Sequence, residues 1–578
     1  MHTSRVIPPR STDLPETPLL AKIRDGVIGD DTVIETPFGS RRVTYADYTA
    51  SGRALDFIEE FITDQVLPRY ANTHTESSGT GLQTTRLRED ARAFIKQAVN
   101  GDDSTAVIFC GSGSTGAIDK LIGMMNLRLP ADLNERYELL NQIPLNDRPV
   151  VFIGPFEHHS NELPWRESIA DVVVIPQDVD GHIDIDVLRE KLKEFAERSI
   201  KIGSFSAASN VTGIVSDTHL ISQTLHEHGA LAFWDFAASA PYIDVEMNPR
   251  DSEHPLAYKD AIFISVHKFI GGPSTPGLLI MRKDLATNSV PDVVGGGTVA
   301  YVNEDSHVYL KDIEHREEAG TPAIVEAIRA GLVFKLKHSV GVETIRAYEH
   351  DFVKRAISYL DGHPNISVLG NKDADRLSIV SFTISGISGK YLHHNFVVAL
   401  LNDVFGIQAR GGCSCAGPYG HRLLGIDIER SHDFEREIDR GCEGIKPGWV
   451  RINFNYFISE TVFEYILKAI EVIAESGEKL LPQYIFDPLS GRWRHKQGAV
   501  EPALRLSDVE FGDSGMTYPH SKVEADVSQC AAYLTEAAAI LEELPAPNLE
   551  STPLWESETF EGLRWFEVAS DTTIEIRK

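Results

Sequence analysis

The stretch that decides the fold is Ser265-Val266-His267-Lys268-Phe269-Ile270-Gly271-Gly272-Pro273, which lies between two short apolar runs, 261–264 and 277–281. The apolar runs predict buried strands, so Lys268 stands at the mouth of the first one. Burial lowers the pKa of a lysine because the ammonium loses its hydration, and a neutral amine forms a Schiff base with an aldehyde. Ser265 and His267 offer hydrogen bonds to a phosphate, and the glycines let a bulky ring approach the backbone. The alternative is a lysine that caps a strand at the surface.

The composition describes a large and acidic chain. It has 578 residues, 42% of them apolar, which suffices for at least two domains because single cores stop growing near ~250–300 residues. With 55 Lys+Arg against 85 Asp+Glu the formal net charge is -30, and such a surface repels nucleic acid and anionic lipid. The chain shows neither an apolar leader nor a run of ~18 apolar residues. We therefore expect a cytoplasmic protein that binds neither nucleic acid nor membranes.

A glycine-rich turn, 111–116, follows the apolar run 106–110. It satisfies the Gly-x-Gly-x-x-Gly pattern of dinucleotide sites, but the acidic residue expected on a second strand ~20 residues later is missing. The turn suits a phosphate equally well, because the N–H groups of Gly113, Ser114 and Thr115 would open a helix whose dipole favours an anion.

Three more polar side chains are predicted to follow buried strands. They are His158 after the run 150–153, Asn210 after 200–207 and Asp235 after 230–234. Ligands of open α/β sheets bind at the carboxyl ends of the strands. A buried carboxylate such as Asp235 can keep a ring nitrogen protonated. For His158 the alternative is an ordinary polar residue of a loop, and for Asp235 it is a residue that caps the next turn.

Together these segments resemble class V aminotransferases, which are fold-type-I enzymes that use pyridoxal 5′-phosphate (PLP), and in particular the cysteine desulfurase and selenocysteine lyase branch. The resemblance covers about residues 40 to 476. It implies an α/β fold with a large domain, whose mainly parallel central sheet is flanked by helices, and a smaller α+β domain. We expect an extended N-terminal arm (1–40), a large PLP-binding domain (41–335), a small domain (336–479) and an extension without a readable role (480–578).

The resemblance also implies the roles of the candidate residues. Lys268 would hold PLP, His158 in Glu157-His158-His159-Ser160-Asn161 would stack on its ring, Asp235 would face the ring nitrogen and Asn210 the 3′-oxygen. The phosphate would be bound by Ser265, His267, Gly113, Ser114 and Thr115, with Thr321 from a partner subunit. Thr321 and the run 295–297 resemble loops that meet a neighbour's cofactor, which implies a homodimer. Ala238 stands where this branch commonly has Gln or His, so one hydrogen bond near the 3′-oxygen is absent or supplied from elsewhere.

The run Ala409-Arg410-Gly411-Gly412-Cys413-Ser414-Cys415-Ala416-Gly417-Pro418 resembles the family pattern Arg-x-Gly-x-x-Cys-Ala-x-Pro. The resemblance implies that Arg410 binds the substrate carboxylate and that Arg451 matches a second family arginine near this carboxylate. Cys415 would reach the side chain of the substrate. One alternative is a buried pair of free cysteines. Another is a zinc site of Cys413, Cys415, His421 and Cys442, although Cys-x-Cys suits structural zinc poorly and we expect no metal. The insertion 420–447 borders this loop and is a candidate lid.

These features predict a cysteine desulfurase-like enzyme. It would take sulfur from L-cysteine, or selenium from selenocysteine, release alanine and leave a persulfide on Cys415 for an acceptor protein. Alternatives with the same fold are an aminotransferase, a C–S β-lyase or an epimerase in which Cys415 is not catalytic. An alternative of another class is a scaffold or sulfur-carrier partner without activity.

Overall fold

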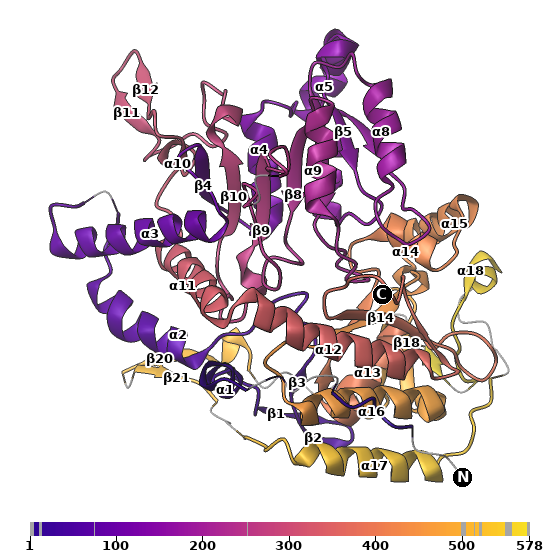
Figure 1. Cartoon of the computed structure of the whole chain (residues 1–578). Coiled ribbons are helices and arrows are strands. Elements are labelled where there is room, and N and C mark those ends of the chain that lie inside the picture. The colour runs from indigo at the N-terminus through magenta and orange to yellow at the C-terminus, as the bar shows by residue number, and fades with distance from the viewer. Residues whose placement is uncertain are drawn as a thin grey trace.

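A seven-stranded sheet forms the centre of the computed structural model, which describes all residues except 1–4, 11–13, 15, 74, 251–252, 499–503, 514, 520–522, 550–557, 571 and 575–578. The strands run in the order β4-β10-β9-β8-β7-β5-β6. Their bounds are β4 (Thr105–Cys110), β5 (Val150–Ile153), β6 (Asp171–Val174), β7 (Lys201–Ser206), β8 (Leu231–Asp235), β9 (Ala261–Ser265) and β10 (Gly277–Arg282). Strands β5 to β9 are parallel, and β10 is antiparallel to both neighbours. The expected mainly parallel sheet is confirmed (Figure 1).

The strands read as short apolar runs because the sheet is covered by helices. Every residue of β4, β5 and β9 is buried, as is usual where helices cover both faces of parallel strands. The connecting helices include α4 (Gly113–Met124), α8 (Ile185–Glu194) and α9 (Thr218–Glu227). Since β5, β7, β8 and β9 are parallel, the residues that follow them gather at one edge of the sheet.

The edge strand β4 is covered by acidic side chains instead of another strand. The N–H groups of Val107 and Phe109 donate to Glu314 Oε1 (2.8 Å) and Glu318 Oε1 (2.7 Å). Arg92 of α3 (Gly79–Ala98) pairs with Glu318 at 2.9 Å. Burial alone would raise the pKa of Glu318, but the adjacent arginines lower it below its ordinary value. These contacts satisfy an otherwise exposed strand edge.

A smaller domain follows two long helices, α11 (Ile324–Val340) and α12 (Val342–Asp361). Its antiparallel sheet has the order β13-β14-β17-β16. The strands are β13 (Ile366–Val368), β14 (Ile379–Ile384), β16 (Arg410–Gly412) and β17 (Trp449–Asn453), with α13 (His394–Phe405) and α16 (Glu460–Ser476) beside them. The pairing of β16 with β17 sets Arg410 opposite Arg451. The pairing therefore brings together two arginines that are far apart in sequence.

The N-terminal segment differs from the extended arm that the sequence predicted. Residues 18–42 form α1 (Pro18–Asp25), β1 (Val33–Thr36) and β2 (Gly39–Arg42). Leu20 and Ile23 are buried, and Arg24 Nε donates to the carbonyl of Phe457 (2.7 Å). The segment is held by contacts with distant parts of the chain, such as that of Arg24 with Phe457, and these leave no periodic pattern of apolar residues in its sequence.

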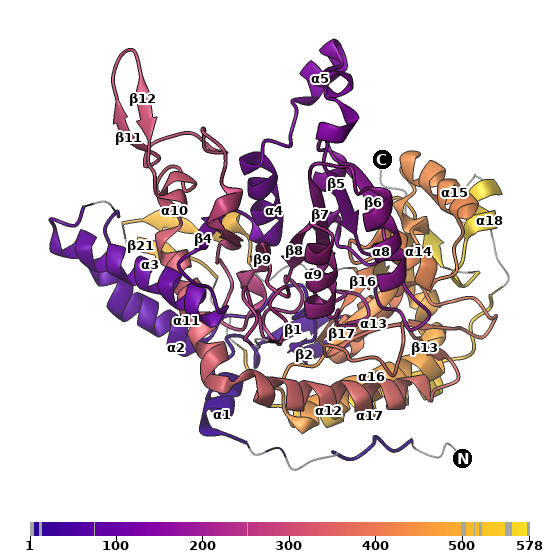
Figure 2. The same cartoon turned by 45° about the horizontal axis from the view of Figure 1, so that its top comes forward.

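The C-terminal extension packs against the small domain. It contains a hairpin of β18 (Tyr484–Asp487) and β19 (Arg492–His495), which confirms the predicted irregular or hairpin segment, and β22 (Thr573–Ile574). Helix α17 (Gln529–Glu543) begins later than the predicted 521, which itself lies outside the described residues. It runs beside α16 in both views (Figures 1 and 2).

An aromatic cluster joins this extension to α13. The ring of Phe566 lies 4.6 Å from His393, 5.3 Å from Phe486 and 5.2 Å from Trp565. Trp565 stacks on His394 at 5.7 Å, and His394 lies directly behind Gly411 of β16. The extension thus supports the strand that carries Arg410.

The insertion 420–447 and its neighbours form two helices, α14 (Gly417–Leu423) and α15 (Ile428–Asp439). Helix α15 contacts α18 (Glu558–Leu563) of the extension. Within the described part of the chain, no helix has both the length and the apolar character needed to cross a bilayer.

Phe566→Ala is expected to lower the free energy of unfolding by about 3–5 kcal/mol, because it removes a fully buried ring. Phe511→Ala, in the same extension but 81% exposed, is the matched control and should change it by less than about 0.5 kcal/mol. Urea unfolding followed by circular dichroism measures both. Equal stability of the Phe566→Ala and wild-type proteins would show that the extension is not part of the folded core.

Candidate active site

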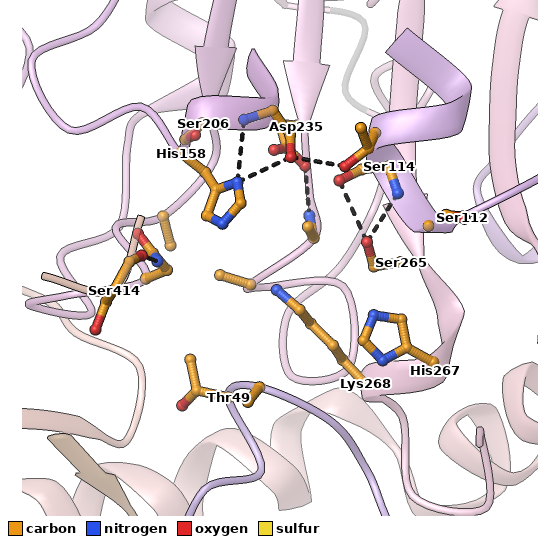
Figure 3. Close-up of a pocket in the computed structure, with 18 of the residues that line it drawn as sticks. Thr49, Ser112, Ser114, His158, Ser206, Asp235, Ser265, His267, Lys268 and Ser414 are labelled. Carbon is orange, nitrogen blue, oxygen red and sulfur yellow. Dashed lines mark hydrogen bonds between the residues drawn. The ribbon is translucent and has the colours of Figure 1, made fainter. Parts of the chain in front are cut away.

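A cavity of about 360 Å³ opens at the carboxyl ends of the parallel strands. It is lined by all the predicted site residues except Cys415 and Thr321, namely Lys268, Asp235, His158, Asn210, Ser265, His267, Gly113, Ser114, Thr115, Arg410 and Arg451. The fold therefore brings together residues from five strand ends and two domains (Figure 3).

Lys268 ends a 3₁₀ turn, Val266–Lys268, directly after β9, and its side chain points into the cavity (Figure 3). Burial lowers the pKa of Lys268 to about 8, while the nearby Asp235 acts in the opposite direction. Burial, and secondly Lys268, also lowers the pKa of His267 to about 4, and its Nδ1 lies 3.3 Å from Ser51 Oγ. The amine is thus still mostly protonated at neutral pH, but its neutral fraction, the form that Schiff-base chemistry requires, is far larger than that of an ordinary lysine.

The glycine-rich turn forms the first turn of α4 against β9. Gly113 has a φ of +57°, and a Cβ there would lie 2.7 Å from Ser265 Oγ, so glycine is needed for both conformation and space. The N–H of Ser114 donates to Ser265 Oγ at 2.8 Å. The N–H groups of Gly113, Ser114 and Thr115 were predicted to bind an anion, but that of Ser114 already donates to Ser265. Ser265 therefore contacts the glycine-rich turn through its side chain.

His158 is held by Ser160, which the sequence analysis did not single out. Nδ1 of His158 accepts the N–H of Ser160 (3.1 Å) and lies 3.0 Å from its Oγ, which is 2.6 Å from Thr115 Oγ1. Because Nδ1 is an acceptor, the neutral ring carries its proton on Nε2. Burial, followed by Lys268, lowers the pKa of His158 to about 3. The sequence signal that could have identified Ser160 is a hydroxyl residue two positions after the histidine.

Two buried carboxyl groups follow or end the strands beside the cavity. Asp235 ends β8, and its Oδ1 accepts the N–H of Ala237 at 2.8 Å. Burial raises the pKa of Asp235, although the Ala237 N–H and Lys268 oppose the shift. Burial likewise raises the pKa of Glu157 to about 7, and this side chain binds Ser206 Oγ (2.6 Å) and Asn161 Nδ2 (2.7 Å). Glu157 holds the loop of His158, whereas Asp235 faces the cavity.

The two arginines differ in their surroundings. Arg410 is exposed and makes no ion pair within the described ranges. Arg451 is buried, and it donates to Asp47 Oδ1 (2.8 Å) and to the carbonyl of Asn210 (3.0 Å). Asp47, a residue that sequence reasoning missed, therefore already occupies part of one predicted carboxylate site.

The cysteine loop contributes a serine to the wall of the cavity. Ser414 lines the cavity, whereas neither Cys413 nor Cys415 does. Ser414 and Cys415 have φ values of +52° and +56°, which cost about 1–3 kcal/mol each for residues other than glycine. Asn210 Nδ2 donates to the carbonyl of Ser414 at 2.8 Å. The amide predicted to face a cofactor oxygen thus also binds this loop, and its buried Oδ1 has no partner among the described residues.

The insertion 420–447 supplies no cavity-lining residue within the described ranges, so it does not cover the cavity as a lid in this conformation. Helix α14 packs instead against loops of the large domain. Arg422 donates to the carbonyl of Pro155, and Tyr419 Oη lies 3.2 Å from Thr212 Oγ1. In the same described part of the chain, no three His, Cys, Asp or Glu side chains are grouped as metal ligands.

A family model for class-V aminotransferases matches residues 44–431. The chain belongs to the class-V aminotransferase family. Probable cysteine desulfurases of Halalkalibacterium halodurans and Halobacterium salinarum are each 26% identical to it, over 67% and 68% of this chain and 87% and 88% of their own lengths. A cysteine desulfurase structure from Thermococcus onnurineus has a TM-score of 0.60 and 24% identity, and covers 75% of this chain and 95% of the other. The likeness confirms the fold-type-I architecture of this class-V chain, whose family uses PLP in general.

In the apoprotein, the Lys268 amine is expected to react with trace acetic anhydride with a pH midpoint near 8, well below the ~10.4 of an unperturbed lysine. Asp235→Asn should move the midpoint lower, because the carboxylate favours the charged amine. Peptide mass spectrometry across a pH series measures both. A Lys268 midpoint near that of exposed lysines would show that the amine is not desolvated.

Proposed function

We propose that this class-V chain is a PLP-dependent cysteine desulfurase. The observation that carries the proposal is the buried Lys268, which lines one cavity together with Asp235 and Arg410 and is close enough for both to influence its pKa. The names of its relatives support the same activity. Selenocysteine, with the same carboxylate and amine, is the second substrate that this arrangement would accept.

The residues present fit the cofactor. Lys268 would hold its aldehyde carbon, and the carboxyl group of Asp235, whose pKa burial raises, would gain a cationic ring nitrogen as its partner. His158 would lie against the ring. The N-terminus of α4, with Thr115 and His267 beside it, would hold the phosphate. Ala238 offers no hydrogen bond to the 3′-oxygen, which leaves the second hydrogen of Asn210 Nδ2 to provide it, the first being donated to the carbonyl of Ser414.

When bound, PLP supplies an electron sink for the pair of electrons left after a proton leaves the substrate Cα. Arg410, exposed and without an ion pair in the described residues, would hold the substrate carboxylate, and Arg451 would support it. The neutral Lys268 amine would take the Cα proton and return it. His158 is neutral, with its proton on Nε2. It would therefore orient the ring by contact and add no positive charge to the site.

Cys415 would be the nucleophile that removes sulfur from the substrate. Its thiolate would attack the sulfur of the bound cysteine, so that an S–S bond forms, the C–S bond breaks and the electron pair returns to carbon, which is then protonated to give alanine. Cys415 is left as a persulfide, and an acceptor protein would take up its outer sulfur. One observation favours the second candidate, a C–S β-lyase, aminotransferase or epimerase: Ser414 and not a thiol lines the cavity.

Cys415→Ser is expected to lower sulfur release from cysteine by orders of magnitude, because serine forms no persulfide and Cys413, the other thiol of the loop, stands two residues from the position that matches the family pattern. The variant should still bind PLP, since the thiol is outside the cavity lining. Cys413→Ser is the matched control and should keep most of the activity. Single-turnover alanine formation and mass mapping of the persulfide are the measurements. Full activity of Cys415→Ser would move the enzyme to the second candidate.

A homodimer with shared sites is part of the proposal. Thr321 and the run 295–297 are exposed and do not line their own cavity. The nearby hairpin of β11 (Val299–Val302) and β12 (His307–Tyr309) projects from the body (Figures 1 and 2), with Tyr301, Val302 and Val308 exposed. Such a surface suits contact with a second copy.

Mixing Lys268→Ala and Thr321→Ala subunits is expected to restore activity that each variant lacks alone. A heterodimer would hold one site with both native residues, whereas each homodimer has none. Light scattering and activity after subunit exchange test this expectation. A monomeric mass, or confirmed exchange without recovery, would contradict it.

A further inference from the structure

We infer that His159 is a positioning residue that holds the loop of Cys415 against the cofactor-facing wall of the large domain. The inference rests on the proposed function and extends it to a residue to which neither the sequence nor the cavity lining gave a role. His159 immediately follows the ring-stacking His158 and precedes Ser160 in the same short 3₁₀ turn, His159–Asn161.

His159 contacts the loop at two points, both of them on its backbone. Its N–H donates to the carbonyl of Cys415 at 2.9 Å. Its Nε2 accepts the N–H of Gly417 at 3.3 Å, so the neutral ring carries its proton on Nδ1. His159 thus holds the loop at the thiol residue itself and again two positions after it.

Asn210 provides an independent anchor on the other side of the thiol residue, through its bond to the carbonyl of Ser414. Both His159 and Asn210 follow strands of the large domain, β5 and β7, while the loop belongs to the small domain. The positive φ values of Ser414 and Cys415 are unfavourable for these residue types, so the bend needs such anchors to persist. The segment that carries the ring-stacking histidine therefore also sets where the thiol lies.

The side-chain bond of His159 can be removed while its backbone bond to Cys415 is kept. In His159→Ala the N–H of Gly417 loses its acceptor, whereas in His159→Gln the Oε1 atom lies where Nε2 was and can accept it. His182→Ala is the control, because this histidine is, like His159, partly exposed and outside the cavity lining, but its side chain lies near Asp178 instead of the cysteine loop. A Cys413→Ser background leaves Cys415 as the only cysteine of the loop.

We expect His159→Ala to raise the rate constant for iodoacetamide alkylation of Cys415 in the apoprotein by about two- to tenfold, the effect of one neutral hydrogen bond. His159→Gln and His182→Ala should react at the wild-type rate. In the PLP-loaded enzyme, His159→Ala should lower kcat for desulfuration by a similar factor and leave KM for cysteine unchanged, because the substrate carboxylate is held by other residues. Peptide mass mapping identifies the alkylated thiol.

Equal alkylation of Cys415 in wild type and His159→Ala would overturn the inference. Equal acceleration in His159→Ala and His159→Gln would also overturn it, since packing and not the bond to Gly417 would then be responsible. The alkylation readout needs no turnover. It therefore decides the role of His159 even if Cys415→Ser keeps its activity, which is the result that would remove the proposed function.

Discussion

The desolvation of the Lys268 amine is the constraint on which the site depends. The same burial that lowers the pKa of Lys268 raises that of Asp235 and lowers those of His158 and His267. Each group is thereby displaced toward its neutral form, and the lysine and the aspartate compensate each other only in part. A ligand that offers an aldehyde to the lysine and a cationic nitrogen to the aspartate would satisfy both groups.

The sheet creates that constraint through its topology. Parallel strands end at one edge, and the loops after β5, β7, β8 and β9 close around it. Polar groups in these loops bind one another, as in the contacts of Glu157 with Ser206 and of Ser160 with Thr115. The bonds leave few alternative positions for the side chains that face the cavity, which is how a rigid scaffold positions reactive groups.

The small domain completes the site from the opposite side. Adjacent antiparallel strands bring the two arginines together, and the aromatic cluster of the C-terminal extension supports β16 from behind. Arg410 remains free of ion pairs in the described part of the chain, while Arg451 is bound to Asp47. The two arginines therefore have unequal capacity for a carboxylate, a difference that arises from packing and not from residue type.

The sequence by itself determined the central features of this protein. The apolar runs predicted the strands, because residues buried on both faces must be apolar, and the polar residue after each run predicted which side chains gather at one edge of the sheet. Lys268, Asp235, His158 and the glycine-rich turn could be found in this way because each is local to one strand end. Only the tertiary structure decided that residues 18–42 fold, that Asp47 pairs with Arg451 and that Ser414 lines the cavity. These outcomes depend on contacts between segments up to several hundred residues apart, and no local pattern encodes which distant group will meet a given side chain.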